Sequence, residues 1–318
     1  MLRYILRRLL QSAVLLFIVL SVVFVAGRSI GDPAILILGA EADAESVLQL
    51  RTRLGLEDPL LTQYLRFIGD ALRGDLGETY RYGMSRGELG GGLPDGRAAL
   101  PLVMERLPAT FYLAGVAIVL SLIIAIPAGI LAAMYPRSLL DRAINVISLA
   151  GVSVVEFWLA LMLVLIFAVT LGWLPTSGYG GFAFVILPAM ALAFRSIGRM
   201  AQITRSAMLD ELSKAYIVTA RAKGLSPARV SLVHALKNAS VPIVTITGDE
   251  VATILTGVII IEFIFSWPGI GQITLDALSR RDLPIVQASI FVLVLIVLIV
   301  NLLVDLAYVI LNPRIRLR

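Results

Sequence analysis

The sequence contains no cysteine and a single histidine, His234. The absence of cysteine excludes disulfides, thiolate metal sites and cysteine nucleophiles. One histidine cannot form a zinc-binding cluster, and it leaves no second histidine for an HExxH motif. We expect His234 to be a surface or packing residue, because it lies in a strongly basic segment.

Charged residues are also scarce, at 15% of the 318 residues, against about 25% in an ordinary soluble domain. Hydrophobic residues make up 58% and gather in six long runs that do not alternate in polarity as barrel strands do. Each run approaches the roughly 20 residues that a helix needs to cross a hydrocarbon core. We therefore predict an all-α membrane protein with one domain over residues 1–318 and six transmembrane helices. The predicted spans are residues 9–27, 109–134, 144–171, 182–200, 241–265 and 285–311.

The first apolar run follows Arg3, Arg7 and Arg8. It is longer than the 7 to 15 residues of a usual signal-peptide core, so we expect a retained helix. The small residues around Gly27 leave a cleaved signal open as the alternative.

The distribution of lysine and arginine predicts the orientation. Eight basic residues lie between Arg195 and Lys237, whereas the short loops of the opposite side hold only Arg280 and Arg281. Because basic residues favour the cytoplasmic side, we expect both termini and the loop 201–240 to be cytoplasmic. This orientation also accounts for the net charge of +5 without a nucleic-acid partner.

The outer loop, residues 28–108, contains two amphipathic patterns, near residues 44–54 and 60–72, and then a glycine-rich stretch near residues 90–96. We expect two short helices across the outer mouth of the helix bundle, followed by a mobile loop.

A nucleotide-binding P-loop is missing. Its lysine must follow a glycine, and none of Lys214, Lys223 and Lys237 does. The chain therefore cannot hydrolyse ATP by that route.

The loop 201–240 is longer than a connector needs. Helix formers reach Lys223, Gly224 is a natural helix stop, and Ser226 with Pro227 is a typical helix start. The pattern predicts two helices joined by a glycine turn, which would present a compact projection to a partner.

The run TARAKGLS in this loop resembles the coupling loop of permease subunits of bacterial ABC importers, in the oligopeptide and dipeptide family. Val218 and Thr219 replace the opening residues of the general motif, and Lys237 replaces its closing proline. The run WPGIG, with RDLP after it, resembles the outer loop of the same family, and segments near both termini are similar as well. The segment 88–103 looks like a local insertion. The outer-loop motif residues are Trp267, Pro268, Gly269 and Gly271.

The resemblance implies a helix that docks on an ATPase subunit. The implied coupling residues are Tyr216, Thr219, Ala220, Ala222, Lys223, Gly224 and Leu225. It also implies a second, related permease subunit, two ATPase subunits that bind ATP and Mg²⁺, and a periplasmic or lipid-anchored substrate-binding protein. The chain itself would need no cofactor and no metal. It would lie in the bacterial inner membrane and move di- or oligopeptides by alternating access.

Three carboxylates fall within predicted spans: Glu156, Asp249 and Glu250. Such residues usually face a water-filled path or pair with another group, since a charge in lipid costs about 2.5–3.5 kcal/mol. Asp249 and Glu250 could line the path and attract a peptide amino group, or pair with Arg195 or a partner subunit. For Glu156 we favour pairing. Asn301 and Asp305 share a helix face and suggest hydrogen bonding between helices.

Other functions stay open at this stage. Similar permeases carry nickel complexes, glutathione or opines. A self-sufficient secondary transporter would explain the buried acids but not the projecting loop, and a membrane enzyme would have only carboxylates to work with.

Overall fold

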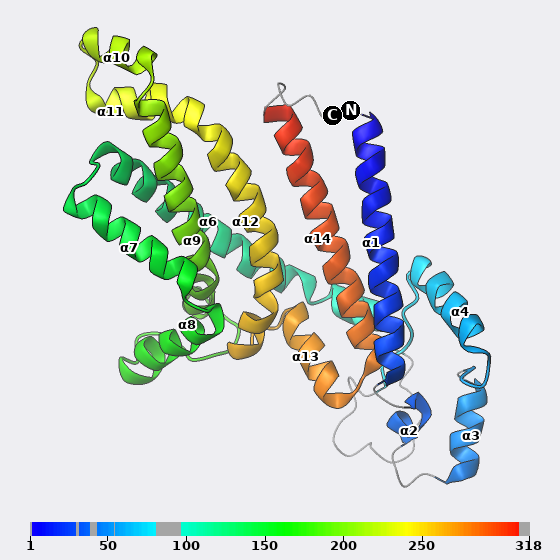
Figure 1. The fold of residues 1–318 in the computed structure, drawn as a ribbon. Helices are drawn as coiled ribbons and strands as arrows, with labels where there is room; N and C mark the ends of the chain where they lie inside the picture. The colour runs from blue at the N-terminus through cyan, green and yellow to red at the C-terminus, as the bar shows by residue number, and fades with distance from the viewer. Residues whose placement is uncertain (1, 30–31, 39–42, 54, 81–96, 312–318) are drawn as a thin grey trace. The chain divides into compact units, whose positions relative to one another are not determined.

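The computed structural model describes residues 2–29, 32–38, 43–53, 55–80 and 97–311. Within these residues, five helices are long and apolar enough to cross a bilayer, and one bent pair of helices supplies a sixth candidate span. The all-α class with about six spans is therefore confirmed. The long helices are α1 (Leu2–Ser29), α6 (Leu107–Met134), α9 (Ala183–Leu212), α12 (Leu236–Ile264) and α14 (Leu283–Leu311) (Figure 1).

The chain divides into two compact units. The first comprises residues 1–108 and 268–298, and the second comprises residues 109–267 and 299–318. The sequence predicts one transmembrane domain over residues 1–318. That expectation stays a prediction, because the two compact units are defined by contacts within the chain.

The first unit contains the outer-loop helices. These are α2 (Pro33–Leu38), α3 (Ala44–Arg53), α4 (Leu60–Leu72) and α5 (Ala99–Met104), followed late in the chain by α13 (Ile270–Arg280). Helices α3 and α4 lie where the amphipathic patterns predicted helices. The glycine-rich stretch 90–96 lies outside the described residues.

A buried apolar cluster joins α1, the outer-loop segment, α13 and the start of α14 within this unit. Its members include Leu20, Leu76, Val103, Ile273 and Ile285. The Thr79 hydroxyl donates a hydrogen bond to the buried carboxylate of Asp282, and the Tyr80 backbone N–H donates to the same carboxylate at 3.2 Å. The outer loop is thus fastened to the turn between α13 and α14.

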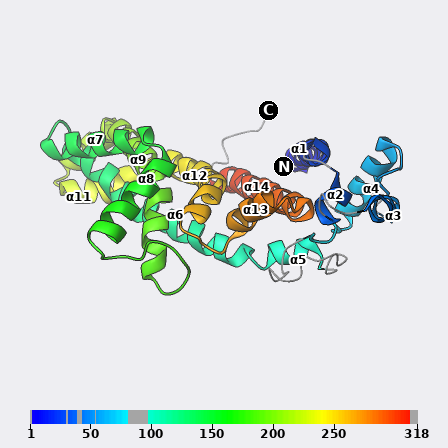
Figure 2. The ribbon, with the colours of Figure 1, turned by 90° about the horizontal axis from the view of Figure 1, so that it is seen from below.

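The second unit is built on α9. Around it lie α7 (Leu139–Ser153), α8 (Glu156–Leu163) with a π-helical extension η1 (Val164–Thr170), and α12, while α7 and α8 lie against α9 in both views (Figures 1 and 2). A Cβ on Gly198 would clash with the Ser148 carbonyl of α7, and one on Gly151 would come within 2.7 Å of the Phe194 carbonyl of α9. Glycine at these two positions lets the α7 and α9 backbones approach closely.

The third predicted span differs from the structure. The run 144–171 was expected to be one helix, but it breaks between α7 and α8, and the two axes meet at 108°. The reason lies in Val154 and Val155, which take extended backbone angles between the helices. Glu156, expected near the middle of a span, is therefore the first residue of α8.

The fourth span also differs, since α9 continues to Leu212 rather than ending near residue 200. Its polar second half is helical, and much of it is buried against other helices of the unit, including Thr204 and Met208. The start of the predicted cytoplasmic loop is thus an extension of α9.

Candidate coupling loop and membrane charge cluster

The α10 loop, residues 213–226, follows α9 and carries the short helix α10 (Ala215–Ala222). Figure 1 shows α10 and α11 (Pro227–Arg229) at the end of α9, next to the start of α12. Gly224 ends the α10 turn with a φ of +79°, a conformation that side chains with a Cβ rarely adopt. The Ser226 hydroxyl then accepts from the Arg229 N–H and begins the next helix, with Pro227 in its first turn. The predicted glycine stop and Ser-Pro start are confirmed.

One side of α10 is anchored by Ile217, which is fully buried. It packs in an apolar cluster with Met208 of α9 and Val230, and Ala220 and Leu225 lie at the edge of that cluster. Ile217 was absent from the predicted coupling residues. The apolar spacing of Ile217 and Ala220, three residues apart, was the signal available for it.

Hydrogen bonds hold the other side of α10. The Tyr216 hydroxyl donates to Glu211 Oε2 at 2.8 Å and accepts from the Asn238 amide at 3.0 Å, while Lys214 pairs with the same Glu211 carboxylate. Burial, opposed by the Asn238 hydrogen bond, raises the pKa of Tyr216, so its hydroxyl stays protonated at neutral pH. These bonds join the end of α9, α10 and the start of α12, and the three segments are expected to move together.

The outer surface of α10 is exposed in the part of the chain that the structure describes. The predicted residues Thr219, Ala222, Lys223 and Gly224 are exposed there. Val218 and Arg221, which the sequence reasoning left out, are exposed beside them, and 63% of Val218 is accessible. The predicted coupling set therefore separates into an exposed face and the anchoring residues Tyr216, Ala220 and Leu225.

Two of the three membrane carboxylates share one guanidinium group. Arg199 of α9 lies 2.8 Å from Asp249 Oδ2 and 3.0 Å from Glu250 Oε1, both of α12. The Ser196 hydroxyl also donates to Glu250 Oε2 at 2.5 Å. The cation that faces this pair is Arg199, not Arg195.

The two carboxylates differ in access. Only 3% of the Glu250 side chain is exposed, against 54% for Asp249. Glu250 thus holds α9 to α12, whereas Asp249 can meet an incoming charged group.

Glu156 lies at the bend between α7 and α8, 3.8 Å from Arg195. Both residues line a cavity of about 310 Å³ together with Val152, Phe157 and Ile260. A Cβ on Gly257 would meet the Glu156 carboxylate at 2.7 Å, so glycine makes room for this carboxylate beside α12. With the Arg199 group, the cluster has three carboxylates against two guanidinium groups and a net charge of −1.

Trp267 of the WPGIG motif is a packing residue and is buried. Its indole N–H donates to the Ala109 carbonyl at 2.9 Å, and its ring meets the Tyr179 ring edge-on with 4.9 Å between centroids. Gly269 precedes α13 as its N-cap, and Gly271 is buried in the first turn of α13. The motif therefore connects the end of α12 to the first turn of α13. The contacts of Trp267 with Ala109 and Tyr179 fix the carboxyl end of α12.

Comparison with known proteins finds matches along nearly the whole chain. Residues 125–317 match the family described as binding-protein-dependent transport system inner membrane component, and residues 1–114 match its amino-terminal counterpart. The chain is 38% identical over 317 residues to the glutathione transport system permease protein GsiC of Escherichia coli strain K12, covering 99% of each chain. It is also 38% identical over 346 residues to the di/tripeptide transport system permease protein DppB of Pseudomonas aeruginosa strain UCBPP-PA14, again covering 99% of each.

A solved structure of the MetNI methionine ABC transporter, in an inward-facing conformation, shares the fold with a TM-score of 0.54. The likeness covers 66% of this chain and 96% of that chain at 17% identity, and it supports the fold alone. The long helices, the α10 loop and the full-length matches agree: the chain belongs to the binding-protein-dependent transport system inner membrane component family and is a multi-pass permease subunit of a bacterial ABC importer.

Proposed function

We propose that this permease moves short peptides across the bacterial inner membrane, driven by ATP that partner subunits hydrolyse. The observation that carries the proposal is the physical continuity of α9 and α12. These helices hold the α10 loop at one end and the Arg199, Asp249 and Glu250 group along their length. A displacement of α10 would therefore reach the membrane charges through two helices.

Short peptides agree with the names of the relatives and with the charged groups of α9 and α12. GsiC and DppB are named for glutathione and for di- and tripeptides, and glutathione is itself a tripeptide. A peptide carries an ammonium group, which Asp249 could face, and a carboxylate, which Arg195 could face. Nickel complexes and opines stay as alternative cargo, because no described residue selects against them.

The proposed assembly contains this chain, a second related permease, two ATPase subunits that bind ATP and Mg²⁺, and a substrate-binding protein outside the membrane. The basic loops support an orientation with both termini and α10 in the cytoplasm. The exposed face of α10 around Val218 and Ala222 is the proposed ATPase contact.

Gly224→Asp tests the coupling role, and Gly172→Asp is the matched control. Both glycines have positive φ and open space around the position of a Cβ, but Gly172 lies after η1, outside the α10 loop. We expect Gly224→Asp to abolish co-purification of the ATPase and peptide uptake, and Gly172→Asp to leave both intact. ATPase association that survives Gly224→Asp, or uptake by the permease without ATPase, would contradict an ATP-driven importer.

Asp249→Ala tests the path proposal, with Thr253→Ala one turn further along α12 as control. We expect weaker uptake of peptides with a free amino terminus and normal uptake of acetylated ones. Glu250→Ala is compared in parallel because Glu250 is buried. If uptake and substrate range are unchanged in all variants, these carboxylates do not line the path.

A further inference from the structure

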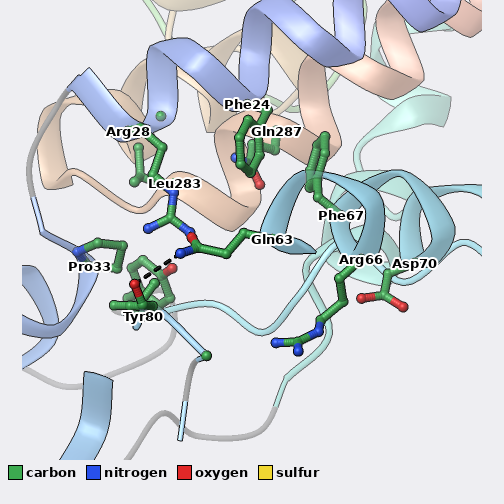
Figure 3. A pocket seen from close by; sticks show the side chains of 13 residues that line it. Phe24, Arg28, Pro33, Gln63, Arg66, Phe67, Asp70, Tyr80, Leu283 and Gln287 are labelled. Atoms are coloured by element: carbon green, nitrogen blue, oxygen red, sulfur yellow. Dashed lines mark hydrogen bonds between the residues drawn. The ribbon is translucent and has the colours of Figure 1, made fainter. Parts of the chain in front are cut away.

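A second cavity, of about 200 Å³, lies in the first unit, where α1 ends and α14 begins. Figure 3 shows Arg28, Gln63 and Tyr80 converging at one part of it, with Phe24, Phe67 and Gln287 beside them. Arg66 and Asp70 of α4 also line the cavity, at a part of it away from Arg28. Neither the coupling role nor the proposed peptide path uses this cavity.

Arg28 is held in place by an amide and an aromatic ring, and Asp32, whose negative charge acts on it, is itself paired with Arg51. Its guanidinium donates to Gln63 Oε1 and lies 5.6 Å from the centre of the Phe24 ring. Gln63 in turn donates to the Leu56 and Asp58 carbonyls at 2.9 and 2.7 Å, so its position is fixed. Within the described residues Arg28 makes no ion pair, whereas the nearby Arg66 pairs with Asp58. Arg28 keeps N–H groups and a full charge available for an anion.

Two further donors line the same cavity. The Tyr80 backbone is held by Asp282, and burial together with the Asp282 charge raises the pKa of its phenol to about 12. The phenol therefore stays a hydrogen-bond donor at neutral pH. The Gln287 amide nitrogen lies beside Gly27, where a Cβ would meet it at 3.1 Å. Neither side chain has a hydrogen-bond partner in the part of the chain that the structure describes.

The ends of two candidate spans indicate that the cavity lies near the boundary between the hydrocarbon core and the lipid headgroups. One candidate span ends at Arg28 and another begins at Leu283, and both residues line the cavity. The aromatic rings beside it are typical of this boundary. An exposed apolar stripe leads away from it along α1, formed by Val14, Ile18, Val22 and Val25. The opposite side of α4 exposes Leu61, Leu65 and Leu72, as in a helix that lies in the membrane interface.

We propose that this cavity binds the phosphate group of a membrane phospholipid. Arg28, Tyr80 and Gln287 donate to the phosphate oxygens, and the acyl chains lie along the apolar stripe of α1. A guanidinium matches phosphate oxygens with two parallel hydrogen bonds, and the stripe accounts for a lipid rather than a free anion. The bound lipid would tie α1 to α4 and α14, and this proposal does not depend on what the transporter carries.

The test is lipid retention by the assembled transporter. The complex is purified from vesicles of phosphatidylethanolamine and phosphatidylglycerol that contain a phospholipid with a photoactivatable acyl chain. Native mass spectrometry counts retained lipid, and peptide mapping locates the cross-link. We expect a cross-link on α1, and retention at least about tenfold lower in Arg28→Gln because a charge-assisted pair is lost. Tyr80→Phe should lower retention severalfold, and the control Arg73→Gln, at an exposed arginine outside the cavity lining, should leave it unchanged.

Each outcome decides the proposal. Equal retention in Arg28→Gln and the unsubstituted complex overturns it. Displacement of the lipid by inorganic phosphate shows a free-anion site and overturns the lipid assignment, and displacement by a dipeptide overturns it in favour of a peptide site. If Arg28→Gln fails to assemble, the conservative variant Tyr80→Phe decides, and unchanged retention there overturns the proposal.

Discussion

The Tyr216 hydroxyl lies 2.8 Å from Glu211 Oε2 and joins α10 to the end of α9. Asn238 reaches the same hydroxyl from α12, so one phenol connects three helices. Such a junction transmits displacement only while it stays stiff. The coupling role proposed for α10 therefore depends on Tyr216 as much as on the exposed residues.

Tyr216→Phe should uncouple ATP hydrolysis from uptake without preventing assembly. The variant removes the hydrogen bonds of the hydroxyl to Glu211, to Asn238 and, at 3.5 Å, to the His234 carbonyl. Because the group is partly exposed, we expect a loss of about 1 kcal/mol. The ratio of peptide taken up to ATP hydrolysed should fall about fivefold. Tyr135→Phe is the control, because Tyr135 is exposed and its hydroxyl makes no hydrogen bond in the described residues. An unchanged ratio in Tyr216→Phe would show that the junction is not part of the coupling path.

Ile217→Ala should lower the stability of the permease, whereas Val218→Ala should weaken its binding to the ATPase. Ile217 is fully buried, and its truncation should lower the stability of the permease by about 2–4 kcal/mol. Val218 is exposed, so its truncation should leave stability unchanged and weaken ATPase binding. Thermal unfolding of the purified permease and titration with the ATPase subunit separate the two effects. Strong ATPase binding by Val218→Ala would place the contact elsewhere on α10.

Gly198→Ala should separate α7 from α9. The added methyl group meets the Ser148 backbone carbonyl, which cannot move as a flexible side chain would. We expect the variant to be less stable by about 1–3 kcal/mol. Gly115→Ala, whose Cβ would have no neighbour within 4 Å, should unfold at the temperature of the unsubstituted protein. Equal unfolding temperatures for both variants would contradict the close α7–α9 approach.

Glu250→Gln should destabilise the protein far more than Asp249→Asn. Removal of the buried charge leaves Arg199 with one exposed partner and disturbs the Ser196 hydrogen bond, at a cost of about 3 kcal/mol. The Asp249 side chain is more than half exposed, so its pair should contribute less than about 1 kcal/mol. Chemical denaturation of the two variants measures the difference. Similar midpoints would show that Glu250 does not hold the α9–α12 pair.

Local patterns predicted several elements well. The Ser226-Pro227 start and the Gly224 stop depend on backbone angles and caps within a few residues, and the structure shows both. The amphipathic helices α3 and α4 follow from periodicity in the same way. The bend before Glu156 had no such signal, because residues 144–171 are largely apolar and an apolar run looks alike whether straight or broken.

Side-chain partners were harder to predict. Arg195 and Arg199 are four residues apart on α9, and either could face the acids of α12; the rotation of α9 against α12 brought Arg199 to Asp249 and Glu250 and left Arg195 with Glu156. Ile217 was missed although its three-residue spacing from Ala220 was an available signal, because the adjacent Val218 is equally apolar. The role of Arg28 was not predicted, since Gln63, which fixes its guanidinium, comes from α4, far along the chain.

The sequence by itself determined that this protein is a helical membrane protein with a projecting loop, because long apolar runs, basic flanks and turn residues act locally, and its motifs resemble those of importer permeases. Only the tertiary structure decided which carboxylate is buried, which side of α10 is exposed and which residues hold Arg28. These properties depend on the rotation and contact of helices, and side chains 50 or more residues apart acquire their neighbours only when those helices pack.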